Sequence, residues 1–401
     1  MATIPFHSAT SAPAPQGMAL FSVGFRPFFL LGSIWSALAL PIWLCVYTGR
    51  IVLLSALAPT TWHVHEMIFG FAFAIAAGFL LTAIPNWTGR LPLKGGPLAG
   101  LAVLWLAGRL AVLFSGSIGS HAAAIIDLAF PAAFVLVIAR ELVAGRNWRN
   151  LPMLVALSLL MCGSALVHLD AIGVAATAPA GNRLGIATML LLIALVGGRI
   201  VPSFTRNWLA KRRPEGALPS QPDRLDMAAL LVTVAGLIAW VVAPESAAAP
   251  WMALAAGIAV AVRLSRWCGL STLREPLVFI LHAGYAWLAL GLVLLGVNGI
   301  EPILPPTTAL HALTIGAIGT MTLAVMTRAT LGHSGQALTA GWGTVAIYVL
   351  ITLAVVLRLA SPMAGASSLE VTWLAGAAWS GAFGLFVLMF GRLLIARRKP
   401  D

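Results

Sequence analysis

Long apolar runs separated by short polar segments make up nearly the whole chain. Each run has about 20 residues, the length that an α-helix needs to cross the hydrocarbon core of a bilayer. The pattern predicts twelve membrane-spanning helices, at about residues 22–46, 62–84, 97–115, 121–141, 151–172, 183–202, 225–243, 250–267, 276–298, 307–328, 340–360 and 371–396. The longest loop is expected at 203–224. We therefore predict an all-α polytopic membrane protein, with residues 1–401 forming a single integral membrane domain.

The composition agrees with this pattern. Of the 401 residues, 60% are hydrophobic and 9% are charged, whereas about a quarter of the residues of a soluble domain are charged. The net charge of +12 comes largely from arginines in short loops between apolar runs, which is typical of membrane proteins, so nucleic-acid binding is not expected. Cys45, Cys162 and Cys268 lie far apart and form no CxxC or CxxCH motif. A disulfide framework, a thiolate metal site and c-type haem are therefore unsupported.

The loops differ in charge, which predicts an orientation. One set of loops carries most of the basic residues, among them Arg90, Arg140, Arg149, Arg206, Lys211, Arg212, Arg213, Arg224, Arg266, Arg274 and the C-terminal Arg397, Arg398 and Lys399. The other set has Arg50, Arg183, Arg358 and little else. By the positive-inside rule, both termini are expected to be cytoplasmic, so spans 2 and 10 begin at the outer face.

A weak internal repeat relates spans 2, 6 and 10. They begin near residues 62, 183 and 307, and they end in GFLLTAIPNWTGR, VGGRIVPSFTRNW and LAVMTRATLGHSG, each with a Pro or Thr break and a polar exit. The spacing predicts three four-helix repeats, at about 22–141, 151–267 and 276–396, with these three spans around one pseudo-axis. The alternative is that apolar helices with such ends resemble one another by chance.

Two histidines lie at matching depth near the starts of spans 2 and 10. An imidazole inside a membrane is costly without a partner, so His65 and His311 are functional candidates. Two helices that each carry a histidine can hold one cofactor between them. We predict a haem with His65 and His311 as axial ligands, and with His63 as the alternative to His65. For His168 and His282, a hydrogen bond to a neighbouring helix is the preferred interpretation.

A copper site is a second prediction for span 2. His63 and His65 are two residues apart, so on a helix they point about 200° away from each other. His63 shares a face with Met67, and an imidazole with a thioether suits Cu(I). Residues His63, Met67 and His168 form the predicted site, against the alternative of a core Met67 and a hydrogen-bonding His63. Glu66 is expected to cap the start of the helix.

A polar cluster is expected at the cytoplasmic ends of spans 6 and 10. Its predicted members are Arg199, Arg328 and His333. The alternative is that such residues are interfacial anchors. Arg199 fits that alternative worst, because it precedes Pro202 by less than one turn inside the predicted span, and it can bind an anionic group or seal a pocket.

Five motifs carry a resemblance to a known family: FRPFF (Phe25–Phe29), WHVHEM, GFLLTAIPNWTG, GGRIVPSFTRNW and HALTIGAIGTMTLAVMTRATLGHSG. They resemble the NnrS family, polytopic bacterial membrane proteins linked to nitric oxide and denitrification and described as containing haem and copper. The resemblance implies a bacterial cytoplasmic (inner) membrane protein that acts in the response to nitric oxide or nitrosative stress.

A more distant similarity is to the catalytic subunits of haem–copper oxidases and nitric oxide reductases. HALTIGAIG, from His311 to Gly319, resembles their tenth helix, which implies three four-helix arcs and a low-spin haem between spans 2 and 10. Ala309 stands where their histidine for the catalytic haem would lie, and spans 6 and 7 contain no histidine. Their copper site and their reduction of oxygen or nitric oxide are therefore not carried over.

A b-type haem with two histidine ligands would suit electron transfer, from a quinol or a redox protein that the sequence leaves open. A membrane redox enzyme or nitric oxide-handling protein is thus the leading interpretation. The alternative is a metal-free transporter, since twelve helices, repeats and helices broken by Gly and Pro also suit that class.

Overall fold

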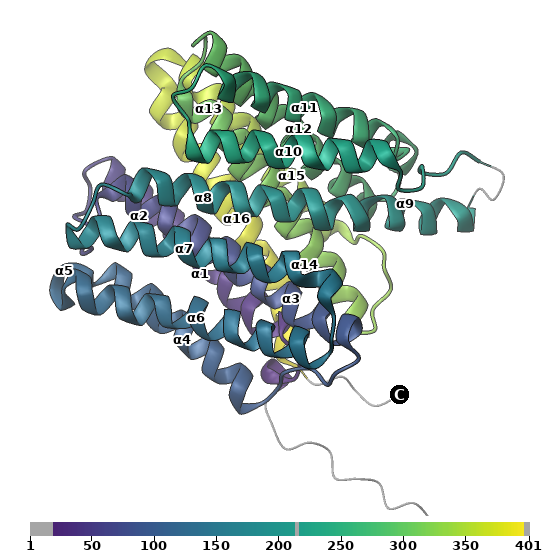
Figure 1. Cartoon of the computed structure of the whole chain (residues 1–401), viewed down its shortest axis with the longest axis horizontal. Coiled ribbons are helices and arrows are strands. Elements are labelled where there is room, and N and C mark those ends of the chain that lie inside the picture. The colour runs from purple at the N-terminus through teal and green to yellow at the C-terminus, as the bar shows by residue number, and fades with distance from the viewer. Residues whose placement is uncertain (1–18, 213–215, 397–401) are drawn as a thin grey trace, which may run out of the picture.

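The computed structural model describes residues 19–212 and 216–396, and these residues form helices with no strand among them (Figure 1). Twelve helical stretches are long and apolar enough to cross a membrane, which confirms the predicted fold class. Arg213, both chain ends and the basic residues Arg397, Arg398 and Lys399 lie outside the described residues. The cytoplasmic location of the termini therefore stays a prediction.

Nine spans are each built on one continuous α-helix. These are α1 (Phe25–Tyr47), α4 (Gly96–Leu113), α6 (Ser120–Ala144), α7 (Leu151–Ile172), α10 (Arg224–Val242), α11 (Ala248–Ser265), α12 (Pro276–Ile300), α15 (Trp342–Ala360) and α16 (Ser368–Ile395). Short helices occupy the connections: η1 (Ala19–Phe21), α5 (Ser115–Ile118), η3 (Trp148–Asn150), η5 (Gly269–Thr272), η7 (Ser361–Met363) and η8 (Gly365–Ser367).

The other three spans each contain a π-helical segment. Span 2 consists of α2 (Pro59–His65), η2 (Glu66–Ala72) and α3 (Phe73–Thr88); span 6 of α8 (Ala178–Leu192), η4 (Ile193–Gly197) and α9 (Gly198–Arg212); span 10 of α13 (Pro306–His311), η6 (Ala312–Gly319) and α14 (Thr320–His333). These are the three spans that the sequence relates to one another. Because π-helical turns often occur at functional sites, the three segments are the first places to look for chemistry.

Spans 2, 6 and 10 are also the innermost spans. Their most apolar windows are 72%, 67% and 72% buried, against at most 61% in any other span. All three are longer than predicted. Pro85 and Pro202 lie inside α3 and α9 and do not end them, and α14 continues to His333. The loop expected at 203–224 is correspondingly shorter, since α9 continues to Arg212.

The three inner spans face a common cavity of about 90 Å³. Its lining is almost entirely apolar and includes Ile75 and Leu80 from span 2, Met189 from span 6, and Met321 and Val325 from span 10. The shared cavity supports the idea that these spans surround one axis. The three four-helix repeats themselves stay a prediction.

Outer helices close the bundle around this centre. The first and last spans pack together through α1 and α16, while α4 packs on α6 and α11 packs on both α10 and α12. In Figure 1, α2, α5 and α13 lie toward one end of the bundle and α9 extends to the other. Large apolar side chains such as Leu38, Val103, Leu136, Leu231 and Leu388 remain exposed around the bundle. The chain is thus a multi-pass membrane protein whose apolar surface contacts lipid.

Candidate metal and cofactor sites

A buried cluster of polar side chains surrounds the π-helical segment of span 2. His65 ends α2 and Glu66 begins η2, and both side chains have no exposed surface. Arg109 of α4, Asp127 of α6 and His168 of α7 are 2–3% exposed. All five lie near the same end of the bundle, because even-numbered spans begin where odd-numbered spans end.

Arg109 joins the two carboxylates of this cluster. Its Nη1 is 2.8 Å from each carboxylate oxygen of Glu66, and its Nη2 donates to Oδ1 of Asp127. Trp35 donates from Nε1 to Glu66 Oε2 at 2.7 Å. Gly70 makes the approach possible, since a Cβ at this position would collide with the guanidinium. Buried charges inside a membrane bundle require such pairing.

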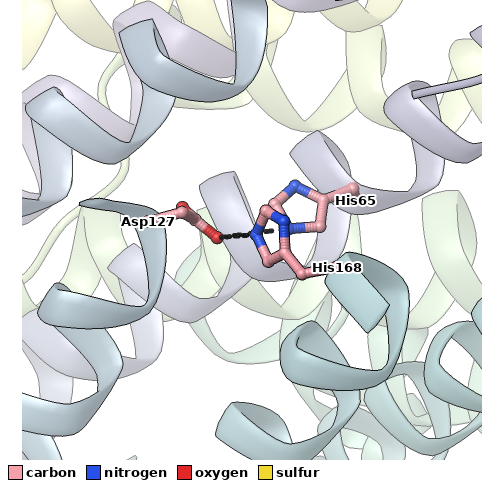
Figure 2. Close-up of side chains that lie close together, drawn as sticks. All are labelled: His65, Asp127 and His168. Atoms are coloured by element: carbon pink, nitrogen blue, oxygen red, sulfur yellow. Dashed lines mark hydrogen bonds and ion pairs between the residues drawn. The ribbon is translucent and has the colours of Figure 1, made fainter. Parts of the chain in front are cut away.

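The second oxygen of Asp127 is the point where two imidazoles converge. Its Oδ2 is 2.9 Å from Nε2 of His168 and 3.3 Å from Nε2 of His65. The two rings lie edge to face with centroids 5.2 Å apart (Figure 2). Ser164 donates to the same Oδ2 at 3.2 Å. His65, Asp127 and His168 therefore form a buried group that can hold a metal ion.

His63 lies two residues before His65 and has different surroundings. Its ring stacks on Trp43, with centroids 4.8 Å apart and planes 16° from parallel. Its Nδ1 is buried and has no hydrogen-bond partner among the described residues. His63 lies within electrostatic range of His311 and of Arg358 on α15. The structure thus brings His63 near His311, while His65 contacts Glu66, Ser164 and Asp127.

His311 ends α13 and is oriented by its own backbone. Its Nδ1 is 2.6 Å from the carbonyl oxygen of Thr307, one turn earlier, and donates to it. This hydrogen bond fixes the tautomer, so Nε2 has no proton and keeps a lone pair for a ligand. The same arrangement is usual for histidines that bind metals.

The residues predicted to bind copper are separated by these contacts. His168 meets Asp127 and His65, whereas His63 meets Trp43, and Met67 packs partly buried against the core. The copper site of His63, Met67 and His168 stays a prediction.

The prediction that Glu66 caps the helix is wrong, because α2 begins at Pro59 and Glu66 lies within the span, bound by Arg109. His282 hydrogen-bonds Thr205 at 2.8 Å, as expected for an interhelical histidine.

The predicted polar site of Arg199, Arg328 and His333 has separate contacts in the structure. Arg328 lies 4.0 Å over the ring of Phe204, and the His333 ring is 5.5 Å from that of Phe25. Arg199 is exposed, and its position in a span that begins at Ala178 places it about 31 Å along the helix, near the opposite interface. Among the described residues, no hydrogen bond or ion pair joins the three, so a shared site stays a prediction.

A second buried arginine supports the π-helical segment of span 6. Arg263 of α11 donates from Nη1 to the carbonyl oxygen of Ala194 in η4 and to the Tyr285 hydroxyl, both at 3.0 Å. Its Nε donates to Oδ1 of Asp226 at 2.9 Å. A Cβ on Gly198 would collide with this guanidinium, as one on Gly70 would with Arg109.

Sequence reasoning missed Arg109 and Asp127. Both stand inside predicted spans, at 97–115 and 121–141, and an ionisable residue at such a position is itself a signal of a site. The sequence did not indicate that Arg109 and Asp127 pair with each other and with Glu66, His65 and His168, contacts that join spans 2, 3, 4 and 5.

The comparison with protein families now adds to this geometry. The profile of the NnrS protein family matches residues 19–398, which include all twelve spans. The chain belongs to the NnrS family. This result confirms the resemblance carried by the five motifs, and both arginine networks lie within the matched region. A search of the curated proteins finds no match to the chain.

Proposed function

We propose that this NnrS-family protein binds a b-type haem in a bacterial inner membrane and acts in the response to nitric oxide or nitrosative stress, with a redox or nitric oxide-handling role. Membership of the family supports the connection with nitric oxide. The twelve spans support the location in a membrane. The electron donor would be a quinol or a redox protein.

The ring nitrogens that His63 and His311 leave free within the described part of the chain are the observation that supports the haem. One histidine comes from span 2 and the other from span 10, and His311 lies within electrostatic range of His63. His311 presents Nε2 as a lone-pair donor, and His63 has a buried nitrogen without a partner among the described residues. His65 is the poorer candidate, because both of its ring nitrogens already meet polar groups of the carboxylate cluster.

The neighbours of this pair also suit a haem. Arg358 is half-buried within electrostatic range of both histidines and can bind the carboxylates at the edge of the macrocycle. Trp43 holds the His63 ring by stacking. A haem with two imidazole ligands supplies one-electron transfer rather than a free position for a gas.

An absorption spectrum of the full-length protein in detergent tests the proposal. We expect a Soret band with sharp reduced α and β bands, typical of low-spin haem. His311→Ala and His63→Ala should each abolish these bands or convert the haem to a high-spin form, because one axial ligand is lost. His282→Ala, which removes a buried histidine far from the pair, serves as the control and should keep the spectrum.

Three results would change the conclusion. Full low-spin haem in His311→Ala would remove the proposal. Loss of haem in His65→Ala together with its retention in His63→Ala would make His65 the ligand. A colourless wild-type protein would instead favour the metal-free transporter.

A further inference from the structure

The cluster at η2 has more negative charge than its arginine can balance. Glu66 and Asp127 are both buried, and Arg109 is the cation that they share. One negative charge is therefore left inside the bundle, where an uncompensated charge is costly. Two imidazole nitrogens face the oxygen of Asp127 that Arg109 does not bind. Either a metal cation or a proton shared among these groups can neutralise the charge.

We infer that His65 Nε2, His168 Nε2 and Asp127 Oδ2 bind one divalent first-row transition metal ion of the zinc class. Two imidazoles and one carboxylate are a donor set that such ions prefer, whereas Mg²⁺ and Ca²⁺ prefer oxygen alone. The ion would neutralise the remaining charge. This site is separate from the haem ligands His63 and His311, so the inference does not depend on the proposed function.

The distances between the donor atoms suit a tetrahedral ion. Metal–ligand bonds of about 2.0–2.1 Å place neighbouring ligand atoms about 3.3 Å apart. The observed separations are 3.3 Å between His65 Nε2 and Asp127 Oδ2 and 2.9 Å between His168 Nε2 and the same oxygen. The three donor atoms all lie within 4.8 Å of one another. Small side-chain shifts are enough to close them around an ion.

Surrounding groups already fix the orientation of the donors. Glu66 Oε1 accepts from Nδ1 of His65 at 3.1 Å, which directs the lone pair of Nε2 toward Asp127. Arg109 and Trp35 hold Glu66 in turn, and Arg109 also holds Oδ1 of Asp127. Such carboxylate–histidine pairs commonly support bound metals.

A small pocket lies beside His168. It has a volume of about 10 Å³ and is lined by Leu57, Ser115, Ser120 and His168, among others. Ser115 begins α5 and Ser120 begins α6, so this cavity lies at the end of the bundle where chain connections are found. The pocket therefore borders His168 on the side away from the apolar centre.

Metal counting on the full-length protein in detergent tests the site. The protein is treated with a chelator, equilibrated with Zn²⁺ and freed of excess metal, and zinc is then measured per chain. We expect one tightly held zinc, with X-ray absorption at the zinc edge showing nitrogen and oxygen neighbours at about 2.0–2.1 Å. His168→Gln and His65→Gln should each lower zinc affinity at least tenfold, because each removes one ligand.

Matched controls separate this site from others. His282→Gln changes another buried histidine and should keep the zinc. Met67→Leu removes the thioether of the predicted copper site and should keep it as well. His63→Ala and His311→Ala should lose low-spin haem but retain zinc, so failure of the haem proposal and failure of this inference are distinguishable.

The inference falls if wild-type protein holds no more zinc than His168→Gln. The remaining charge would then be balanced by a proton shared among the two imidazoles and Asp127. It also falls if the zinc edge shows sulfur neighbours, or if the bound zinc is lost in His63→Ala and retained in His65→Gln.

Discussion

The π-helical segments of spans 2 and 6 are built alike and differ in charge. In each, an arginine from a neighbouring span passes over a glycine, Gly70 or Gly198, and contacts the segment. Arg263 faces one buried carboxylate, Asp226, with the Tyr285 hydroxyl and backbone carbonyls as its other partners. Arg109 faces two carboxylates and is accompanied by His65 and His168.

The difference in charge separates two roles for an arginine that contacts a π-helical segment: one structural and one chemical. A balanced pair such as Arg263–Asp226 satisfies the polar groups that a π-helical turn leaves open. The excess negative charge at Arg109 has no structural purpose by itself, since burying it costs stability. Together with two imidazoles it creates a place for a cation. Span 2 thus carries the donor groups of the proposed metal site, whereas the arginine beside span 6 supports its π-helical segment.

Replacing Arg109 should give the largest effect. Arg109→Met leaves Glu66 and Asp127 buried without their shared cation, which should destabilise the protein by about 3–5 kcal/mol. Thermal unfolding in detergent, followed by the loss of the monodisperse peak in size-exclusion chromatography, measures this. A variant that elutes and melts like the wild type would show that the carboxylates are protonated or otherwise paired.

Replacing Arg263 should cost less. Arg263→Met removes the donor to Asp226, Ala194 and Tyr285, but Asp226 keeps Arg266, whose Nη1 is 3.2 Å from Oδ2. We expect a loss of about 1–3 kcal/mol and no change in bound zinc. If Arg263→Met proves more destabilising than Arg109→Met in the same melting assay, the charge comparison between the two networks is wrong.

The architecture could be predicted from the sequence, because the length of an apolar run is enough to indicate a membrane-spanning helix. Helix ends were harder to predict. The sixth span was expected to end at Pro202, whereas α9 continues to Arg212. The π-helical segments have no local signal in their residues, as they depend on partners such as Arg109 and Trp105, whose Nε1 donates to the Gly70 carbonyl at 3.0 Å.

The candidate sites were accessible only in part. His63, His65, His168 and His311 stand out as ionisable groups in apolar runs, but their pairing needs the packing of spans 1, 2, 4, 5, 10 and 11. The sequence paired His65 with His311 by depth. In the structure, His65 contacts the carboxylate cluster through Glu66, the next residue, and its ligation of a haem together with His311 stays a prediction.

Removing one hydroxyl group from each arginine network should test the difference between the networks with a smaller loss of stability. Ser164→Ala removes the donor to Asp127 Oδ2, and Tyr285→Phe removes the partner of Arg263. Each should cost about 0.5–1.5 kcal/mol of stability. Only Ser164→Ala should weaken zinc binding, by roughly 10–100-fold, because it orients a ligand oxygen. Equal zinc affinities in the two variants would mean that Ser164 has only a structural role.

The smallest effect is expected where the network of span 6 reaches the surface. Asp223 lies just before α10, accepts from the first-turn amides of that helix and binds both Nη atoms of Arg266. Hydrogen bonds from the Arg266 guanidinium hold the pKa of Asp223 well below its usual value of 3.8. A carboxyl group with a lowered pKa stabilises the fold at pH values above its usual pKa, and this contribution is lost only as the pH falls below that value.

Asp223→Asn should therefore lower the melting temperature by less than Arg263→Met does, and by the same amount throughout the range from about pH 5.5 to 8. Because this pair is exposed, about 1 M salt should shrink the difference, whereas the effect of Arg109→Met should persist. A melting difference that varies with pH in this range would show that Asp223 titrates there and is not held by Arg266.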